Sequence, residues 1–396
     1  MVGKCLFCFD DLAPGSEEHV FLSALGGRLT TRQATCSRCN NDFAKAEFGK
    51  IDDALADAFL LVRCALLIRS GRDQPPPTIV KAGRLQSGAE YDLAPGLVPI
   101  TRRGLVPDFR TIQGNSVNLV ARDFGDAKRM IEIAEKRGVS PHVRKVERVE
   151  TKAPRTEIAS NLDLTKMWRA VAKTALVGSC VLYGNETVHS FADSRLRQAV
   201  KTGKPEISEY AGCDYVNIWP SVLSAAAHRH TPSATRSSFD HSLLVADVGE
   251  DSVAYVELFG AFRFSLRLGR KTGLPAKGFA LNPRARGRIE LAISTPANYE
   301  RRCQGSYPDE ARRTRKGFED SMAKVLSTWD REASQQHFEN LAQELIQLVE
   351  QTGFDDDARR VAISEWTQRI AQLENGHAWR TELDMSLVDD DPDDET

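Results

Sequence analysis

The chain has 396 residues, 41% of them hydrophobic and 27% charged, with 53 Lys and Arg against 55 Asp and Glu. This length allows about two or three domains, and the apolar content excludes a wholly disordered chain. The longest apolar stretch, residues 54–68, contains Asp57 and Arg63, so no membrane-spanning helix is expected. No signal-peptide pattern follows Met1, and the cytoplasm is therefore the expected location.

Two C-x-x-C pairs lie within the first forty residues, and they comprise Cys5, Cys8, Cys36 and Cys39. Thiolates from two tight turns complete a tetrahedral site, which predicts a structural zinc ion. A redox motif would need a single pair at a strand–helix junction, and a disulfide framework would need an oxidising compartment. The remaining cysteines stand singly and are interpreted as small buried side chains: Cys64, Cys180, Cys213 and Cys303.

The segment between the two pairs carries an acidic residue directly before a histidine, Glu18-His19, and then a Gly26-Gly27 turn. Asn40 follows the last cysteine at the expected start of a helix. Over residues 1–52 this combination resembles the HNH endonucleases, also called ββα-metal or His-Me finger nucleases. It is most similar to the branch with the order C-x-x-C, Glu-His, Gly-Gly, C-x-x-C-Asn.

The resemblance implies a role for each residue of the motif. His19 would be the general base that activates water, and Glu18 and Asn40 would hold a catalytic Mg²⁺ or Mn²⁺. Asn41, one residue further on, is the alternative to Asn40 as the second metal ligand. Thr31 stands where many members carry a middle asparagine, and Glu18 replaces the more usual Asp. These departures leave an alternative open, a zinc-stapled binding protein without catalysis.

Hydrophobic periodicity predicts the elements that follow along the chain. Helices are expected over 41–49, 51–68, 126–137, 163–182 and 311–373, the last broken at 353–355. Strands are expected over 117–121, 142–149, 242–248, 253–259 and 262–268, the last three as an antiparallel meander. On the 163–182 helix, Trp168, Arg169 and Lys173 are expected to form a basic face.

The predicted fold class is α+β: a zinc-stapled ββα-metal module, a larger mixed α/β region and a helical C-terminal segment. The polar stretch that ends in Pro75-Pro76-Pro77 suggests the first domain boundary. The expected divisions are 1–70, 78–310, 311–380 and an acidic tail over 381–396.

The net charge of −2 conceals a strong segregation of charge along the chain. Residues 263–316 contain 14 Lys and Arg against four acidic residues, whereas residues 381–396 contain eight acidic residues and no Lys or Arg. The basic region favours a nucleic-acid partner, with double-stranded DNA as the first choice, and the tail would compete for it. Candidate phosphate contacts are Arg28, Arg32, Arg38, Arg284, Arg286 and Arg288.

The resemblance thus implies a metal-dependent endonuclease that hydrolyses phosphodiester bonds. Long chains with a small nuclease head often belong to bacterial anti-phage systems, and such modules often act as dimers. Both properties are expectations from the resemblance alone.

Overall fold

The N-terminal segment folds into a short β-hairpin followed by a helix. Strand β1 (Glu18–His19) pairs antiparallel with β2 (Thr30–Thr31), and the 3₁₀ turn η1 (Ser23–Leu25) lies between them. Helix α1 (Ser37–Asp42) follows, and the Cys36 side chain caps it by accepting a hydrogen bond from the Cys39 amide. This is the ββα arrangement that the resemblance implies, but the helix expected over 41–49 is wrong: α1 begins at Ser37, because Cys36 caps it there, and ends at Asp42. Residues 46–49 lie outside the described ranges.

The computed structural model describes most of the chain in separate ranges. These are residues 3–12, 16–45, 50–84, 90–102, 124–137, 162–204, 206–213, 238–285, 288–291 and 307–351, with 360, 361 and 364. The chain forms two compact units, Met1–Met322 and Ala323–Thr396. No helix of the described ranges is long and apolar enough to cross a membrane.

The predicted helix over 51–68 is two helices, so the prediction of a continuous helix is wrong. Helix α2 (Ile51–Ala58) ends at Phe59, and α3 (Leu60–Ala65) begins directly after it. The backbone of Phe59 leaves helical geometry, with φ −106° and ψ 17°. Its ring is fully buried and packs edge-on against Phe262 at 4.7 Å between centroids. The apolar spacing continues through the break, and periodicity therefore gives no sign of it.

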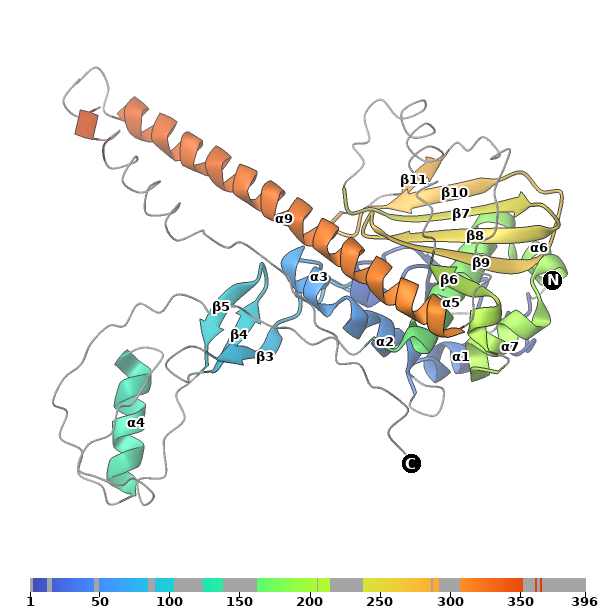
Figure 1. Cartoon of the computed structure of the whole chain (residues 1–396), viewed down its shortest axis with the longest axis horizontal. Coiled ribbons are helices and arrows are strands. Elements are labelled where there is room, and N and C mark those ends of the chain that lie inside the picture. Colours follow the sequence, from blue (N-terminus) through green and yellow to red (C-terminus); the bar gives the residue numbers. More distant parts are fainter. Residues whose placement is uncertain are drawn as a thin grey trace. The chain divides into compact units, whose positions relative to one another are not determined.

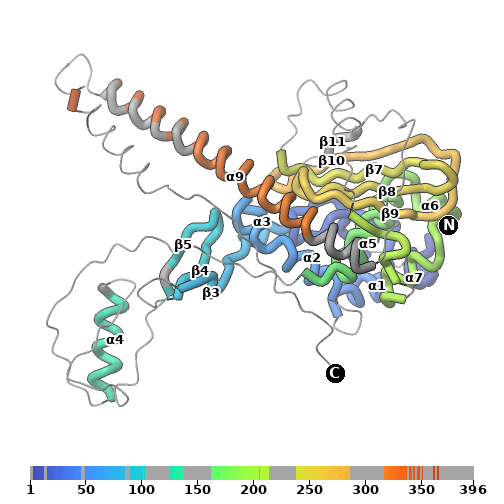
Figure 2. The backbone as a smooth tube through the Cα atoms, viewed as in Figure 1, coloured from blue at the N-terminus to red at the C-terminus, as the bar shows by residue number. Residues whose placement is uncertain are grey.

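The centre of the first unit is a six-stranded antiparallel sheet with the order β11-β10-β7-β8-β9-β6 (Figures 1 and 2). Its strands are β6 (Ala211–Cys213), β7 (His241–Val248), β8 (Asp251–Leu258), β9 (Phe262–Arg270), β10 (Lys277–Leu281) and β11 (Arg288–Leu291). The predicted meander corresponds to β7, β8 and β9 and is confirmed. The sequence did not predict β6, β10 or β11.

Helix α5 (Leu164–Tyr183) is the principal buried helix, and it contacts the sheet as well as β1 and α2. Its predicted position is confirmed. A Cβ added at Gly178 would lie 2.2 Å from Leu243 of β7 and 3.1 Å from Val20, which follows β1. The helix therefore lies tightly between the sheet and the N-terminal hairpin, and it brings side chains distant in sequence to β1.

The remaining described elements are a small sheet and several helices. A three-stranded antiparallel sheet, which the sequence did not predict, joins α3 through a hydrogen bond from Gly96 N to Cys64 O. Its strands are β3 (Ile79–Arg84), β4 (Glu90–Ala94) and β5 (Val98–Thr101). The helices are α4 (Phe124–Lys136), α6 (Asn185–Phe191), α7 (Ser194–Thr202), η4 (Ile207–Glu209) and α9 (Tyr307–Gln351).

Several predictions fall on residues outside the described ranges. The strands expected over 117–121 and 142–149 lie there, as do the break at 353–355 and the acidic tail over 381–396. The helix expected over 126–137 is confirmed as α4, and α9 confirms the first helix of the C-terminal segment.

Candidate functional site

The two C-x-x-C pairs converge on one point beside the hairpin. The four Sγ atoms of Cys5, Cys8, Cys36 and Cys39 all lie within 4.8 Å of one another. A tetrahedral zinc site with Zn–S bonds of about 2.3 Å has S···S edges of about 3.8 Å, so the cluster fits a zinc ion. Three of the cysteines are buried and Cys8 is half-buried, as is usual for a closed structural site.

His19 lies half-buried on β1, beneath the Gly26-Gly27 turn. Its Nδ1 is buried and has no hydrogen-bond partner among the described residues. Burial lowers the pKa of His19 below its ordinary value, and the charge of Arg72 lowers it further. A Cβ added at Gly71 would lie 3.3 Å from the imidazole Cε1 and 1.9 Å from Gly27 O, so only glycine fits there. Because its pKa is lowered, the imidazole of His19 is neutral at neutral pH, and its buried Nδ1 has no hydrogen-bond partner among the described residues.

Glu18 lies next to His19 but is buried, and its side chain meets a lysine from α5. Glu18 Oε1 lies 3.1 Å from Lys173 Nζ, which also contacts both carboxylate oxygens of Asp52 at 2.8 Å. Although burial lowers the pKa of Lys173, the carboxylates of Asp52 and Glu18 outweigh burial and raise it overall. Glu18 Oε2 is buried and has no partner among the described residues.

The expected basic face of the 163–182 helix is wrong, because the structure buries it. Trp168, Arg169 and Lys173 are all less than 7% exposed. Arg169 donates hydrogen bonds to the carbonyls of Val200 and Lys201, and Lys173 pairs with carboxylates. A helical pattern alone cannot distinguish a solvated cation from one that meets a buried partner on another element.

Asn40 lies on α1 with its amide nitrogen 2.6 Å from Glu17 O, at the start of β1. This hydrogen bond engages the amide nitrogen of Asn40 and not its amide oxygen, and Asn41 is an exposed residue. At the position of the missing middle asparagine, Thr31 Oγ1 accepts a hydrogen bond from Gln33 N at 3.1 Å. Thr31 therefore stabilises this loop by its own side chain.

A further asparagine, from α6, also holds the loop, and no sequence pattern indicates this contact. Asn185 Nδ2 donates to Gln33 O at 2.6 Å and to Lys4 O at 2.9 Å. His189 Nε2 donates to the same Lys4 carbonyl at 2.9 Å. These residues are more than 150 positions from the loop in sequence, and only the packing of α6 against the cysteine cluster brings them there.

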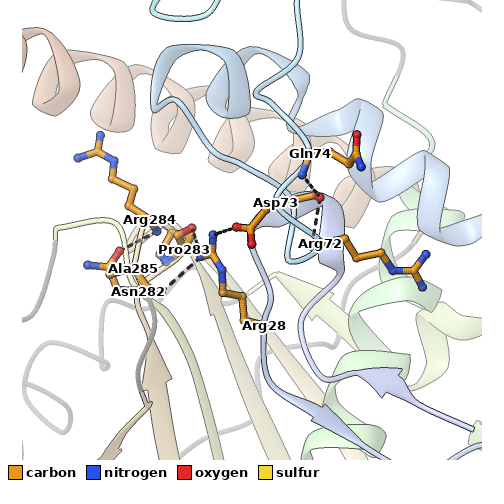
Figure 3. A network of polar contacts seen from close by, with 9 residues as sticks. Arg28, Arg72, Asp73, Gln74, Asn282, Pro283, Arg284 and Ala285 are labelled. Atoms are coloured by element: carbon orange, nitrogen blue, oxygen red, sulfur yellow. Dashed lines mark hydrogen bonds and ion pairs between the residues drawn. The ribbon is translucent and has the colours of Figure 1, made fainter. Parts of the chain in front are cut away.

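The predicted phosphate contact Arg28 lies in a polar network close to the Gly26-Gly27 turn (Figure 3). It pairs with Asp73 at 3.2 Å and donates to the carbonyls of Pro283 and Ala285, at 3.4 Å each. The adjacent Arg72 is exposed, and its guanidinium group extends away from this network (Figure 3). Arg72 is thus a basic residue near His19 that the sequence did not single out.

Two other predicted contacts have acidic partners on the surface of the same segment. Arg32 pairs with Glu17 at 2.7 Å, and Arg38 pairs with Asp10 at 2.6 Å. All four side chains are at least half exposed, so these ion pairs contribute little to stability and can exchange with a phosphate group.

The predicted contacts beyond residue 280 differ in what the structure describes. Arg284 Nε donates to Leu66 O at 3.1 Å, and its guanidinium group lies 4.6 Å from the centroid of the Phe239 ring. Arg286 lies outside the described residues, and Arg288 is the first residue of β11.

The comparisons with known proteins agree with this geometry. Residues 5–60 match the family of HNH endonucleases. The matched segment contains the cysteine cluster, both strands of the hairpin, α1 and α2, so the N-terminal part of the chain is an HNH module. No curated protein and no solved structure matches the chain.

The HNH module also offers oxygen ligands that suit a catalytic Mg²⁺ or Mn²⁺. Glu18 Oε2 is a buried oxygen without a partner in the described part of the chain, and the Asn40 amide contributes a neutral oxygen. Such hard donors are the ligands that these cations prefer. The donor chemistry of these two residues therefore fits a hard divalent cation.

Proposed function

We propose that this protein is a metal-dependent endonuclease that hydrolyses phosphodiester bonds of nucleic acid, with double-stranded DNA as its substrate. The observation that carries the proposal is His19: a half-buried imidazole whose Nδ1 has no hydrogen-bond partner among the described residues, in a ββα module with four clustered cysteines. Because no described residue donates a hydrogen bond to Nδ1, its lone pair is available to accept a proton, as a general base must.

In the proposed reaction, neutral His19 takes a proton from a water molecule, and the water oxygen attacks the scissile phosphorus. The bond from phosphorus to the leaving sugar oxygen then breaks. Glu18 and Asn40 would hold the divalent metal, which when bound stabilises the charge that develops on the phosphate and on the leaving oxygen. The exposed guanidinium group of Arg72 is placed to attract the phosphate backbone toward His19.

The decisive comparison is between the zinc-loaded wild-type protein and a His19→Ala variant, each incubated with supercoiled plasmid and Mg²⁺ or Mn²⁺. Removal of a general base typically costs about 10²–10⁴-fold in rate, so the variant should nick at most 1% as fast. His189→Ala is the matched control, because His189 is also half-buried and contacts the module through Lys4 O. It should cleave at nearly the wild-type rate.

Equal cleavage by wild type and His19→Ala would contradict the role of His19. A protein that binds plasmid tightly but never nicks it would support the alternative, a zinc-stapled binding protein. That alternative has one structural argument in its favour, because the charge of Glu18 is already partly balanced by Lys173.

The proposal extends to an anti-phage role and to a homodimer that cuts both strands. Both extensions come from the family resemblance. Phage plating on cells with wild-type protein or the His19→Ala variant tests the first, and sedimentation of the DNA complex tests the second.

A further inference from the structure

A buried ion cluster connects the HNH module to a helix that begins more than 100 residues after it. Lys173 is 3% exposed, and its ammonium group lies 3.1 Å from Glu18 Oε1 and 2.8 Å from each carboxylate oxygen of Asp52. The same ammonium group lies 4.8 Å from the centroid of the Phe43 ring, directly after α1. Lys173 thus contacts three parts of the module: β1, α2 and the end of α1.

The cluster distinguishes the two oxygens of the Glu18 carboxylate. Oε1 is engaged by Lys173, whereas Oε2 is buried and has no partner among the described residues. A buried carboxylate oxygen without a partner is costly, and buried polar atoms of this kind are normally satisfied by a ligand, an ion or water. The asymmetry therefore indicates that Oε2 is reserved for a ligand that the chain itself does not provide.

We propose that Lys173 is a positioning residue of the nuclease site: it holds Glu18 Oε1 and thereby presents Oε2 to the catalytic metal. This inference rests on the proposed function. It also assigns part of the site to α5, outside the segment of residues 5–60 that matches the family. Lys173 binds neither metal nor substrate; it acts through Glu18.

The physical basis is the support that metal ligands receive from groups behind them. A freely rotating carboxylate loses conformational entropy when it binds a metal. A carboxylate that a hydrogen-bonded cation already holds has lost this entropy before binding, so it binds the metal more tightly. Removal of such outer partners typically lowers metal affinity by about 10–100-fold. Asp52, which Lys173 also contacts, fixes the ammonium group in turn and prevents it from approaching Oε2.

The test compares Mn²⁺ binding to the zinc-loaded full-length wild type and to a Lys173→Met/Asp52→Asn double variant. The double substitution removes one positive and one negative charge, so the cluster keeps the same net charge and the Glu18 residue itself is retained, without its ammonium partner. The fraction of free Mn²⁺, measured by electron paramagnetic resonance during a titration, gives the affinity. We expect the double variant to bind Mn²⁺ at least 10-fold more weakly than wild type.

Arg169→Met serves as the matched control on the same helix. Arg169 is likewise buried and hydrogen-bonded, but the carbonyls it binds belong to Val200 and Lys201. This variant should lose stability in urea unfolding and keep the wild-type Mn²⁺ affinity. Zinc content and the circular dichroism spectrum establish that each variant is folded before the titration.

Three results would overturn the role of Lys173. Unchanged affinity in the double variant would show that Glu18 needs no support, and tighter binding would show that Lys173 competes with the metal. An equal loss of affinity in Arg169→Met would show a general effect of destabilisation. Failure of the proposed function is distinguishable, because the wild type itself would then bind no Mn²⁺ beside its zinc and would nick no plasmid.

Discussion

Single buried polar residues connect the HNH module to the rest of the first unit. His241 on β7 is completely buried, and its Nε2 donates to Leu25 O at 2.9 Å while its Nδ1 accepts from Phe259 N at 3.1 Å. The ring also stacks on Phe21 at 5.1 Å. Both nitrogens are used by a neutral imidazole, so a second proton would break the hydrogen bond from Phe259 N.

This environment predicts that the protein loses stability in mild acid. Burial lowers the pKa of His241 to about 4, against 6.5 for the ordinary group. The stabilisation is therefore complete above pH 6.5 and is lost as the pH falls from 6.5 to 4, because the unfolded chain binds the proton first. The shift corresponds to about 3 kcal/mol, measurable by urea unfolding across this range.

A His241→Asn variant provides the comparison. It should be less stable than wild type at pH 7 and should approach the wild-type stability at pH 4. Loss of zinc in acid affects both proteins equally, so the difference between their unfolding free energies isolates the histidine. A difference that stays constant from pH 7 to pH 4 would contradict the prediction.

At the scale of elements, the ββα unit is too small to fold by its own core. Strands β1 and β2 have two residues each, and α1 has six. Isolated helices and hairpins of this size are marginal in water. The four cysteines that join the two ends of this unit therefore supply the stabilisation, and the contacts of α5 with β1 and α2 add to it.

Removal of zinc is therefore expected to unfold the ββα unit before the sheet. Apparent binding energies for structural zinc are about 10–16 kcal/mol, more than an element of this size otherwise gains on folding. Hydrogen exchange followed by mass spectrometry, with and without a chelator, measures the effect. Protection should be lost over residues 16–45 and retained over β7, β8 and β9. Unchanged protection over 16–45 would contradict a structural role for zinc.

The same scale shows where sequence patterns succeed and where they fail. The periodicity of the apolar positions predicts helix α5 to within one residue at each end, and the structure shows Asp163 and Gly184 as its caps. Strand β10 and the sheet of β3 to β5 were missed, since their identity depends on which strand lies beside them. The break at Phe59 was missed because a ring contact with Phe262, not a local signal, accompanies it.

At the scale of the whole molecule, charge is distributed so that basic and acidic regions are far apart in sequence. Basic residues dominate 263–316, and residues 381–396 are acidic, so the net charge of −2 says nothing about either region. Opposite charges on one chain attract each other at low ionic strength, within a Debye length of about 10 Å at 0.1 M salt.

Deletion of residues 381–396 should therefore raise the affinity for DNA at low salt. We expect the tail to compete with phosphates for the basic region, and its removal also takes away eight negative charges. Fluorescence anisotropy with a labelled duplex at two salt concentrations measures the change, which should shrink as salt rises. Equal affinity of the two proteins at low salt would contradict the competition.

The sequence by itself determined the features whose residues lie close together along the chain. The C-x-x-C pairs, Glu18-His19 and Asn40 all fall within forty residues, and their spacing was sufficient to recognise the HNH module that residues 5–60 match. Chemistry of this kind depends on local turns and short elements, which local sequence specifies.

Only the tertiary structure decided which side chains from distant elements contact and hold these residues. Lys173 meets Glu18 and Asp52, Asn185 holds the loop at Gln33, and His241 connects Leu25 to the sheet. Each partner comes from an element more than 100 residues away, and each would be read in isolation as an ordinary polar residue. Burial then makes these contacts specific, because a charge or a hydrogen-bonding group removed from water must find its partner within the fold.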